Sequence, residues 1–360
     1  MAENKSLSIY FIVPYPFGEA PSQRFRFEQY FDVLIEQNIK FKTSSFYSIN
    51  SWKILYKRSY YLQKVWYVIL GFLKRIIDLV NCHSADYVFI HREVTPIGPP
   101  LFEWMIAKVL KKKIIFDFDD AIWLPNTSNE NKWIAKLKFH SKTGMICKWA
   151  YKISAGNTYL AAYAQQFNEN VIVNPTTIAT HLQQLKSEKK PSSNKVIIGW
   201  TGTHSTLKYL YEIEDFLKKL SDNKSTIINV IANKKPTFDF PFEFKYWNKT
   251  TEIDDLLKID IGIMPLTDNE WSKGKCGFKA LQFMSLGIPV IASSVGVNNQ
   301  IISHGINGFL VSKILDWEIV VNQLITNKEL RQSIGKNAKI YIETHFSSNS
   351  NKQNFLSLFT

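Results

Sequence analysis

The sequence predicts an α/β protein made of two doubly wound, parallel-sheet domains. Its 360 residues exceed what one hydrophobic core usually serves. Short apolar runs alternate with helix-like segments in both halves, which is typical of parallel sheets. The polar stretch KSEKKPSSNK (186–195) separates these two halves and predicts a linker. We therefore expect domains over 1–190 and 191–345, followed by a short amphipathic helix over 346–360.

The composition is that of a soluble globular protein, with 45% hydrophobic and 21% charged residues. Cys82, Cys147 and Cys276 share no metal-like spacing and cannot form a disulfide framework, so we expect a reducing, cytoplasmic location. The apolar run in MAENKSLSIYFIVPYP is too short for a signal peptide and predicts a first strand. No apolar run approaches the ~20 residues that a spanning helix needs.

The net charge of +13 predicts an anionic partner. Nucleic acid, an anionic membrane surface and phosphorylated substrates all meet that description. The sequence contains no helix-turn-helix, zinc-finger, RRM or KH pattern, so nucleic acid is the least favoured of the three, and we expect none.

The first strand, over 7–14, leads into a loop and a helix for which Ser22 is the expected N-cap. Arg24 and Arg26 follow at the carboxyl edge of this strand, where open α/β sheets bind ligands. A solvated basic turn is the alternative interpretation.

Residues 52–80 combine apolar and aromatic positions at helical spacing with interleaved basic residues and a single acid, Asp78. This pattern fits an interfacial helix on an anionic membrane. The alternative is a pair of core helices whose apolar face packs on the sheet, with a basic outer face.

Two further strands, over 85–93 and 112–123, end in polar clusters that are candidate sites. His91 ends the first, where it would orient a hydroxyl or assist proton removal, or else serve as a hydrogen-bonded loop histidine. Asp119 and Asp120 end the second, where they would coordinate a metal, accept the hydroxyl groups of a ligand or form a structural cap. A helix is expected next, over 131–151, followed by a last βαβ unit.

In the second half, VIIGWTGTHSTLKYL (196–210) predicts a strand, a glycine turn and a helix start. Thr203 and Ser205 offer hydroxyls there, and Lys208 lies within the first turn of the helix. The alternative is a capped helix with an exposed lysine. Trp247 ends the strand at 242–248, where it would stack on a nucleobase or simply pack.

The stretch 274–310 carries a glycine turn at Gly277 and a helix over 278–286, which Gly287 ends. A glycine turn that opens a helix presents unpaired N–H groups, which suit a phosphate. Lys275 and Lys279 flank that helix start and add positive charge. The alternative is an ordinary αβ unit with two solvated lysines.

QFMSLGIPVIAS (282–293) resembles the donor-site signature of family 4 of the retaining, nucleotide-sugar-dependent glycosyltransferases, which have the GT-B fold. That family carries a Glu-x7-Glu pattern on this turn and helix. Here Gln282 stands at the second position, and Gly274 stands at the first. The resemblance implies that the two domains face a cleft and that the final helix crosses back onto the first domain.

The resemblance also implies a nucleotide diphosphate sugar as co-substrate, with no cofactor and no metal. It places the acceptor, a glycan or lipid-linked sugar of bacterial surface polysaccharide synthesis, on the first domain. The implied catalytic residues are His91, Lys279 and Gln282. Donor contacts are expected from Thr203, Ser205, Lys208, Trp247, Lys275, Gly277 and Phe278, and acceptor contacts from Arg24, Arg26, Asp119 and Asp120.

Two other functions stay open. One is an epimerase of the same architecture that acts on sugar nucleotides without transfer. The other is a non-catalytic sugar-nucleotide-binding protein, which the substitutions at 274 and 282 make a serious alternative.

Overall fold

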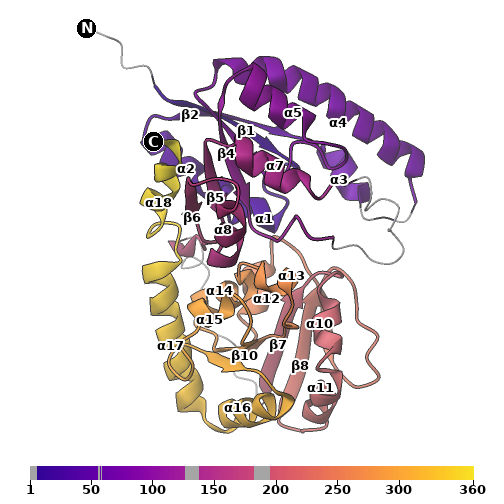
Figure 1. The fold of residues 1–360 in the computed structure, drawn as a ribbon. Helices are drawn as coiled ribbons and strands as arrows, with labels where there is room; N and C mark the ends of the chain where they lie inside the picture. Colours follow the sequence, from indigo (N-terminus) through magenta and orange to yellow (C-terminus); the bar gives the residue numbers. More distant parts are fainter. Residues whose placement is uncertain (1–5, 56, 58, 126–137, 182–194) are drawn as a thin grey trace. The chain divides into compact units, whose positions relative to one another are not determined.

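The computed structural model describes residues 6–55, 57, 59–125, 138–181 and 195–360. The chain forms two compact units: the first comprises 1–176, 274–276 and 352–360, and the second comprises 177–273 and 277–351 (Figure 1). The boundary expected at 190 lies outside the described residues, as does most of the expected linker. The start of the helix expected over 131–151 lies outside them too.

The first unit is built on a six-stranded sheet of order β2-β1-β3-β4-β5-β6, in which every neighbouring pair is parallel. Its strands are β1 (Ser8–Val13), β2 (Lys40–Ser45), β3 (Tyr87–His91), β4 (Lys113–Phe118), β5 (Lys152–Ala155) and β6 (Val171–Val173). Its α-helices are α1 (Pro21–Arg24), α2 (Phe31–Glu36), α3 (Ile49–Leu55), α4 (Tyr61–Asn81), α5 (Leu101–Trp104), α7 (Lys142–Trp149), α8 (Thr158–Gln165) and α18 (Lys352–Leu356). Short helical turns add η1 (Glu28–Tyr30), η2 (Cys82–Ser84), η3 (Met105–Val109) and η5 (Ser357–Phe359).

The second unit repeats this plan with a six-stranded sheet of order β12-β11-β10-β7-β8-β9, again parallel throughout. Its strands are β7 (Val196–Gly202), β8 (Thr226–Ala232), β9 (Glu243–Tyr246), β10 (Ile261–Met264), β11 (Val290–Ser293) and β12 (Phe309–Val311). Its helices are α10 (Leu207–Tyr211), α11 (Glu214–Ser221), α12 (Glu252–Leu256), α13 (Glu270–Lys273), α14 (Phe278–Ser285), α15 (Asn298–Ile301), α16 (Ile314–Thr326) and α17 (Lys328–His345). These two doubly wound sheets confirm the predicted fold class.

The end of the chain completes the core of the first unit. Phe355 of α18 is fully buried and stacks on Tyr30, with ring centroids 4.4 Å apart. Leu358 and Phe359 join the same apolar cluster as Phe11 and Phe89 of the sheet. The expected return of the final helix to the first domain is therefore confirmed.

The first helix begins earlier than the sequence suggested. Ala20 is its N-cap, and Ser22 lies inside the helix, so the prediction of a Ser22 cap is wrong. Pro21 explains the difference, because a proline has no N–H and its fixed φ suits the first position of a helix.

Helix α4 turns its polar side inward. Its buried residues are Gly71, Arg75 and Asp78, whereas Leu62 and Trp66 are 86% and 57% exposed. The interpretation of 52–80 as core helices with a buried apolar face is therefore wrong for this helix. Within the described residues, no helix combines the length and apolarity that crossing a bilayer requires.

Candidate functional site

Four neighbouring strands of the second unit end at one edge of its sheet, in the order β10, β7, β8, β9. Thr203 follows β7, Asn233 follows β8 and Trp247 follows β9. Because parallel strands direct their carboxyl ends to the same edge, the polar groups of these loops gather there. Helix α14, which comes after β10, adds Lys279.

The loop after β7 is held by its own hydroxyls. Thr203 and Ser205 hydrogen-bond through their Oγ atoms at 2.8 Å, and Thr206 Oγ1 accepts from the Thr203 amide at 3.0 Å. The His204 amide donates to Asn233 Oδ1 at 2.7 Å, which ties this loop to the end of β8. The result is an exposed, hydroxyl-lined turn whose backbone is already fixed.

Lys279 reaches this loop from α14. Its Nζ lies 3.1 Å from Thr206 Oγ1 and 4.4 Å from the ring centroid of Trp200, a buried residue of β7. An ammonium over an indole face is stabilised by the ring quadrupole. Gly202 leaves the space for it, since an added Cβ there would lie 2.7 Å from Lys279 Nζ. The positive charge is therefore preorganised beside the Thr206 hydroxyl, in the loop that also carries Thr203 and Ser205.

Gly277 opens α14 and is constrained both by its backbone conformation and by its neighbours. Its φ is +68°, in the left-handed region, and an added Cβ would lie 2.4 Å from Ile301 Cδ1. Phe278 is the first residue of α14 and is half-buried. Gly287, with φ +71°, ends the helix as predicted. The first turn of α14 thus presents amides beside Lys279, at the positive end of its dipole.

Changing Gly277 to alanine is expected to destabilise the protein for two reasons, a strained φ and a collision. We expect a loss of about 2–4 kcal/mol of unfolding free energy, from about 1 kcal/mol of backbone strain and about 1–3 kcal/mol of overpacking. Gly305→Ala is the matched control, because its φ is +76° but nothing lies within 4 Å of the added Cβ. Urea unfolding of both variants measures the difference; equal losses would show that the contact with Ile301 relaxes freely.

A carboxylate joins Trp247, a predicted donor contact, to Gln282, a predicted catalytic residue. Gln282 Nε2 donates to Glu252 Oε1 at 3.1 Å, and Trp247 Nε1 donates to the same oxygen at 3.0 Å. Glu252 and Gln282 are buried, and Trp247 is half-buried. A glutamate at 282 would oppose a second carboxylate at this distance, so the neutral amide fits its neighbour.

Gly274 has no room for a side chain. An added Cβ would lie 2.6 Å from Ala121 Cβ and 2.8 Å from the Ala121 amide nitrogen, both in the first unit. The absence of an acid at 274 is therefore built into the packing of this segment.

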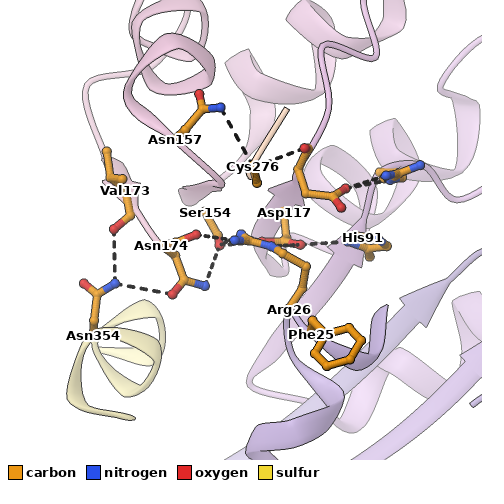
Figure 2. A network of polar contacts seen from close by, with 12 residues as sticks. Phe25, Arg26, His91, Asp117, Ser154, Asn157, Val173, Asn174, Cys276 and Asn354 are labelled. Atoms are coloured by element: carbon orange, nitrogen blue, oxygen red, sulfur yellow. Dashed lines mark hydrogen bonds and ion pairs between the residues drawn. The ribbon is translucent and has the colours of Figure 1, made fainter. Parts of the chain in front are cut away.

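A buried charge network occupies the carboxyl edge of the first sheet (Figure 2). Asp117 at the end of β4 pairs with Arg26, accepts from Ser154 Oγ at 2.5 Å, and lies 2.7 Å from His91 Nδ1. Burial by itself raises the pKa of Asp117, but Arg26 and His91 lower it more, so this carboxyl titrates well below its usual range.

The same network reaches the end of the chain. Arg26 also donates to the Asn174 carbonyl, and Asn354 of α18 donates to Asn174 Oδ1 at 3.3 Å. Arg26 and His91 are fully buried, so neither is open to a ligand in this structure. His91 Nε2 has no hydrogen-bond partner among the described residues.

Asp119 and Asp120 form a second, half-buried cluster in the first unit. Arg92 donates to Asp119 at 2.8 Å and to Asp120 at 2.6 Å. Burial raises the pKa of Asp120, although Arg92 and Lys275 oppose the rise. Lys275 belongs to this unit, and its carbonyl accepts from Asn157 at 2.9 Å. No group of three or more His, Cys, Asp or Glu side chains in the described ranges is arranged to hold a metal ion.

The structure gathers some predicted residues and separates others. Thr203, Ser205 and Lys279 meet at one loop, and Trp247 and Gln282 meet at Glu252. Lys208 lies on the exposed side of the five-residue α10, its Nζ 5.0 Å from the Tyr209 ring. Arg24 is half-buried, with its guanidinium 4.9 Å from the ring of Phe25.

The sequence analysis missed Glu252 and Asn233. Asn233 directly follows β8, so its position beyond a strand end was an available signal. Glu252 begins α12, and nothing local in the sequence distinguishes it from the other acids of TEIDDLL.

Comparison with known proteins relates this chain to sugar-transfer enzymes. The family model "Glycosyl transferases group 1" matches residues 154–341, just over half of the chain. "Glycosyltransferase 1 domain-containing protein 1" of Xenopus tropicalis is 28% identical over 149 residues, which are 38% of this chain and 42% of that protein. The match thus spans less than half of that relative's length.

Solved structures share the fold over nearly the whole chain. HepE of Anabaena, crystallised with UDP, superimposes with a TM-score of 0.64 at 13% identity and covers 98% of this chain and 99% of its own. Sucrose-phosphate synthase of Thermosynechococcus elongatus gives a TM-score of 0.67 at 11% identity, with 98% of both chains covered. At these identities the likeness establishes the GT-B fold alone. With the family match and the two parallel sheets, it shows that the chain belongs to the group 1 glycosyl transferases.

Proposed function

We propose that this protein is a retaining glycosyltransferase that moves a sugar from a uridine diphosphate sugar to a glycan or lipid-linked acceptor. The observation that carries the proposal is the placement of Lys279. Its ammonium lies between the Trp200 face and the Thr206 hydroxyl, at the sheet edge where α14 begins. The uridine nucleotide is inferred from HepE, a structure of the same fold crystallised with UDP.

The bond that breaks joins the anomeric carbon to the diphosphate, so negative charge grows on the leaving group. Lys279 and the first-turn amides of α14 would stabilise that charge without reorganising. Preorganised electrostatic stabilisation of this kind is the largest contribution to the rate enhancement of many enzymes. We infer that transfer is metal-independent, because these groups supply the positive charge. The departing diphosphate then takes the proton of the acceptor hydroxyl on the face it leaves.

The acceptor is assigned to the first unit. Asp119 and Asp120 are half-buried rather than closed off, and their carboxylates suit sugar hydroxyls. His91 is sealed beneath the surface in this structure, so its direct contact with an acceptor remains a prediction. Arg26 is assigned a positioning role through Asp117, because its guanidinium is engaged by the protein's own groups.

The nucleoside is assigned to the cluster of Trp247, Glu252 and Gln282. An indole offers a stacking face for the base, and a buried carboxylate accepts hydrogen bonds from ribose hydroxyls. Glu252 thereby supplies the negative charge that positions 274 and 282 lack. Gln282 and Trp247 fix the orientation of that carboxylate.

Changing Glu252 to glutamine is expected to weaken UDP binding roughly tenfold or more, because a charge-assisted hydrogen bond is lost. Calorimetry with UDP and with its 2′,3′-dideoxy analogue measures the effect, and the variant should no longer discriminate between the two. Glu243→Gln, an exposed change on β9, is the matched control. If the variant still prefers UDP over the analogue, Glu252 does not contact the ribose.

A second candidate is a non-catalytic sugar-nucleotide-binding protein, which the missing acids at Gly274 and Gln282 favour. An epimerase is a third. Incubation with a panel of nucleotide sugars separates them: slow hydrolysis to the diphosphate supports the transferase, inversion at C2 supports the epimerase, and binding without turnover supports the binding protein.

We further infer that the protein acts in bacterial cell-surface polysaccharide synthesis, on the cytoplasmic face of a membrane. The excess positive charge of +13 supports this location, because membranes and nucleotide sugars are both anionic.

A further inference from the structure

The outward face of α4 is an apolar surface that the proposed chemistry does not use. Ten large apolar side chains of this one helix are between 39% and 86% exposed. They are Tyr61, Leu62, Val65, Trp66, Ile69, Leu70, Leu73, Ile76, Ile77 and Val80. Scattered apolar residues are normal on a protein surface, but a continuous helical face of this kind marks a binding surface.

This orientation of α4 is fixed by buried polar contacts. Arg75 donates to the Val94 carbonyl at 2.8 Å, to the Val13 carbonyl at 2.7 Å and to Asp78 at 2.6 Å. Asp78 in turn accepts from Tyr10 Oη at 2.8 Å, and burial together with Asp78 raises the pKa of Tyr10 to about 12. Rotating the helix to bury its apolar side would break every one of these bonds.

Close packing on the inner side supports the same orientation. Gly71 lies over Phe46, and an added Cβ would come within 2.5 Å of that ring. The missing side chain at Gly71 therefore lets the helix backbone approach Phe46 closely. Figure 1 shows α4 along the outer side of the first unit, beside α5. Leu101 and Trp104 of α5 are also exposed, at 56% and 42%.

The charges around this face favour an anionic partner. Lys64 and Lys74 lie on α4, and Lys57 precedes it, whereas the single acid of the helix, Asp78, is buried. A second copy of the chain would bring the same positive charge against itself. An anionic lipid surface complements the lysines and also accepts the apolar side chains.

We propose that α4 docks the protein on an anionic lipid membrane, lying in the plane of the interface with its apolar face among the acyl chains. Tyr61 and Trp66 place aromatic rings at that boundary. A cavity of about 280 Å³, lined by Phe17, Glu28, Ser45 and Lys74 among others, adjoins the helix. The identification of this cavity as the entrance for a lipid-linked acceptor rests on the proposed function; the docking itself does not.

Flotation of the full-length protein with lipid vesicles tests the proposal. The wild type is expected to float with phosphatidylcholine vesicles that contain phosphatidylglycerol, and less with phosphatidylcholine alone. Leu73→Gln/Ile77→Gln keeps helix formers at both sites and is expected to lower partitioning at least about tenfold, since two large apolar side chains are lost. Ile319→Gln/Ile340→Gln, on exposed positions of α16 and α17, is the matched control and should float like the wild type.

Lys64→Gln/Lys74→Gln is expected to reduce binding to the anionic vesicles several-fold and to weaken its salt dependence. Wild-type protein that stays unbound with anionic vesicles would overturn the proposal, as would equal flotation of the Leu73→Gln/Ile77→Gln variant. A dimer in sedimentation that this variant dissociates, without vesicle binding, would assign the face to a second copy instead. UDP titration separates the two proposals, because failure to bind UDP would end the transferase proposal and leave the flotation result intact.

Discussion

Replacing Lys279 with alanine is expected to lower the rate of sugar transfer, or of slow donor hydrolysis, about 10²–10³-fold. Removing one preorganised donor from a developing anion has this effect in other enzymes. The structure gives the reason here: Lys279 Nζ is held 3.1 Å from Thr206 Oγ1 and over Trp200, beside the amides at the start of α14. The loss should fall on kcat more than on KM, because the charge grows in the transition state.

Lys219→Ala is the control for this experiment. Lys219 is 71% exposed on α11 and pairs with Glu318, so its loss should leave turnover unchanged. Lys279→Arg keeps the positive charge and is expected to retain part of the rate. If Lys279→Ala turns over as fast as Lys219→Ala, the lysine does not stabilise the leaving group.

Replacing Asp117 with asparagine is expected to cost about 3–5 kcal/mol of unfolding free energy, because it leaves Arg26 as an unpaired charge in the core. Both side chains are fully buried, and Ser154 and His91 depend on the same carboxylate. Urea unfolding at neutral pH measures the loss. Asp239→Asn, which removes an exposed partner of Lys218, is the control and should change stability little.

The fall of the unfolding free energy at acid pH gives a second measurement of this network. The pKa of Asp117 is lower in the folded than in the unfolded protein. The ionised carboxylate therefore contributes its full stabilisation at pH values above the pKa of an unfolded aspartate, which is about 4. That contribution is lost as the pH falls from there toward the folded value. In Asp117→Asn, the unfolding free energy should therefore depend less steeply on pH in the acid range. An unchanged dependence would show that other groups govern it.

Most of the strands could be predicted, because they are apolar runs of the length that a parallel sheet requires. Strand β2 was not predicted, because its sequence, KFKTSS, is not such a run. The helix after Gly277 could be predicted as well, since glycine adopts the left-handed φ of +68° that precedes the helix without steric cost. Thr203, Ser205 and Lys279 come after strands that are neighbours in the second sheet, so they could be expected at the same edge of that sheet. These inferences needed only periodicity and local backbone chemistry.

The environment of single side chains could not be predicted in the same way. The spacing in α4 showed an apolar face but not which way it points, because Arg75 and Asp78 find partners 19 to 68 residues away in sequence. The sequence places Arg26 among the acceptor contacts, yet its partner Asp117 is 91 residues away and holds it in the core. Glu252 became a site residue only once Gln282, 30 residues on, was placed beside it.

Isothermal titration of the wild type and of Lys279→Ala with UDP tests the central claim most directly, namely that the edge of the second sheet binds a nucleoside diphosphate. The account predicts one site per chain in the wild type and at least tenfold weaker binding in the variant, with uridine bound poorly by both. Equal affinity of the two proteins for UDP, or no binding to the wild type, would contradict it.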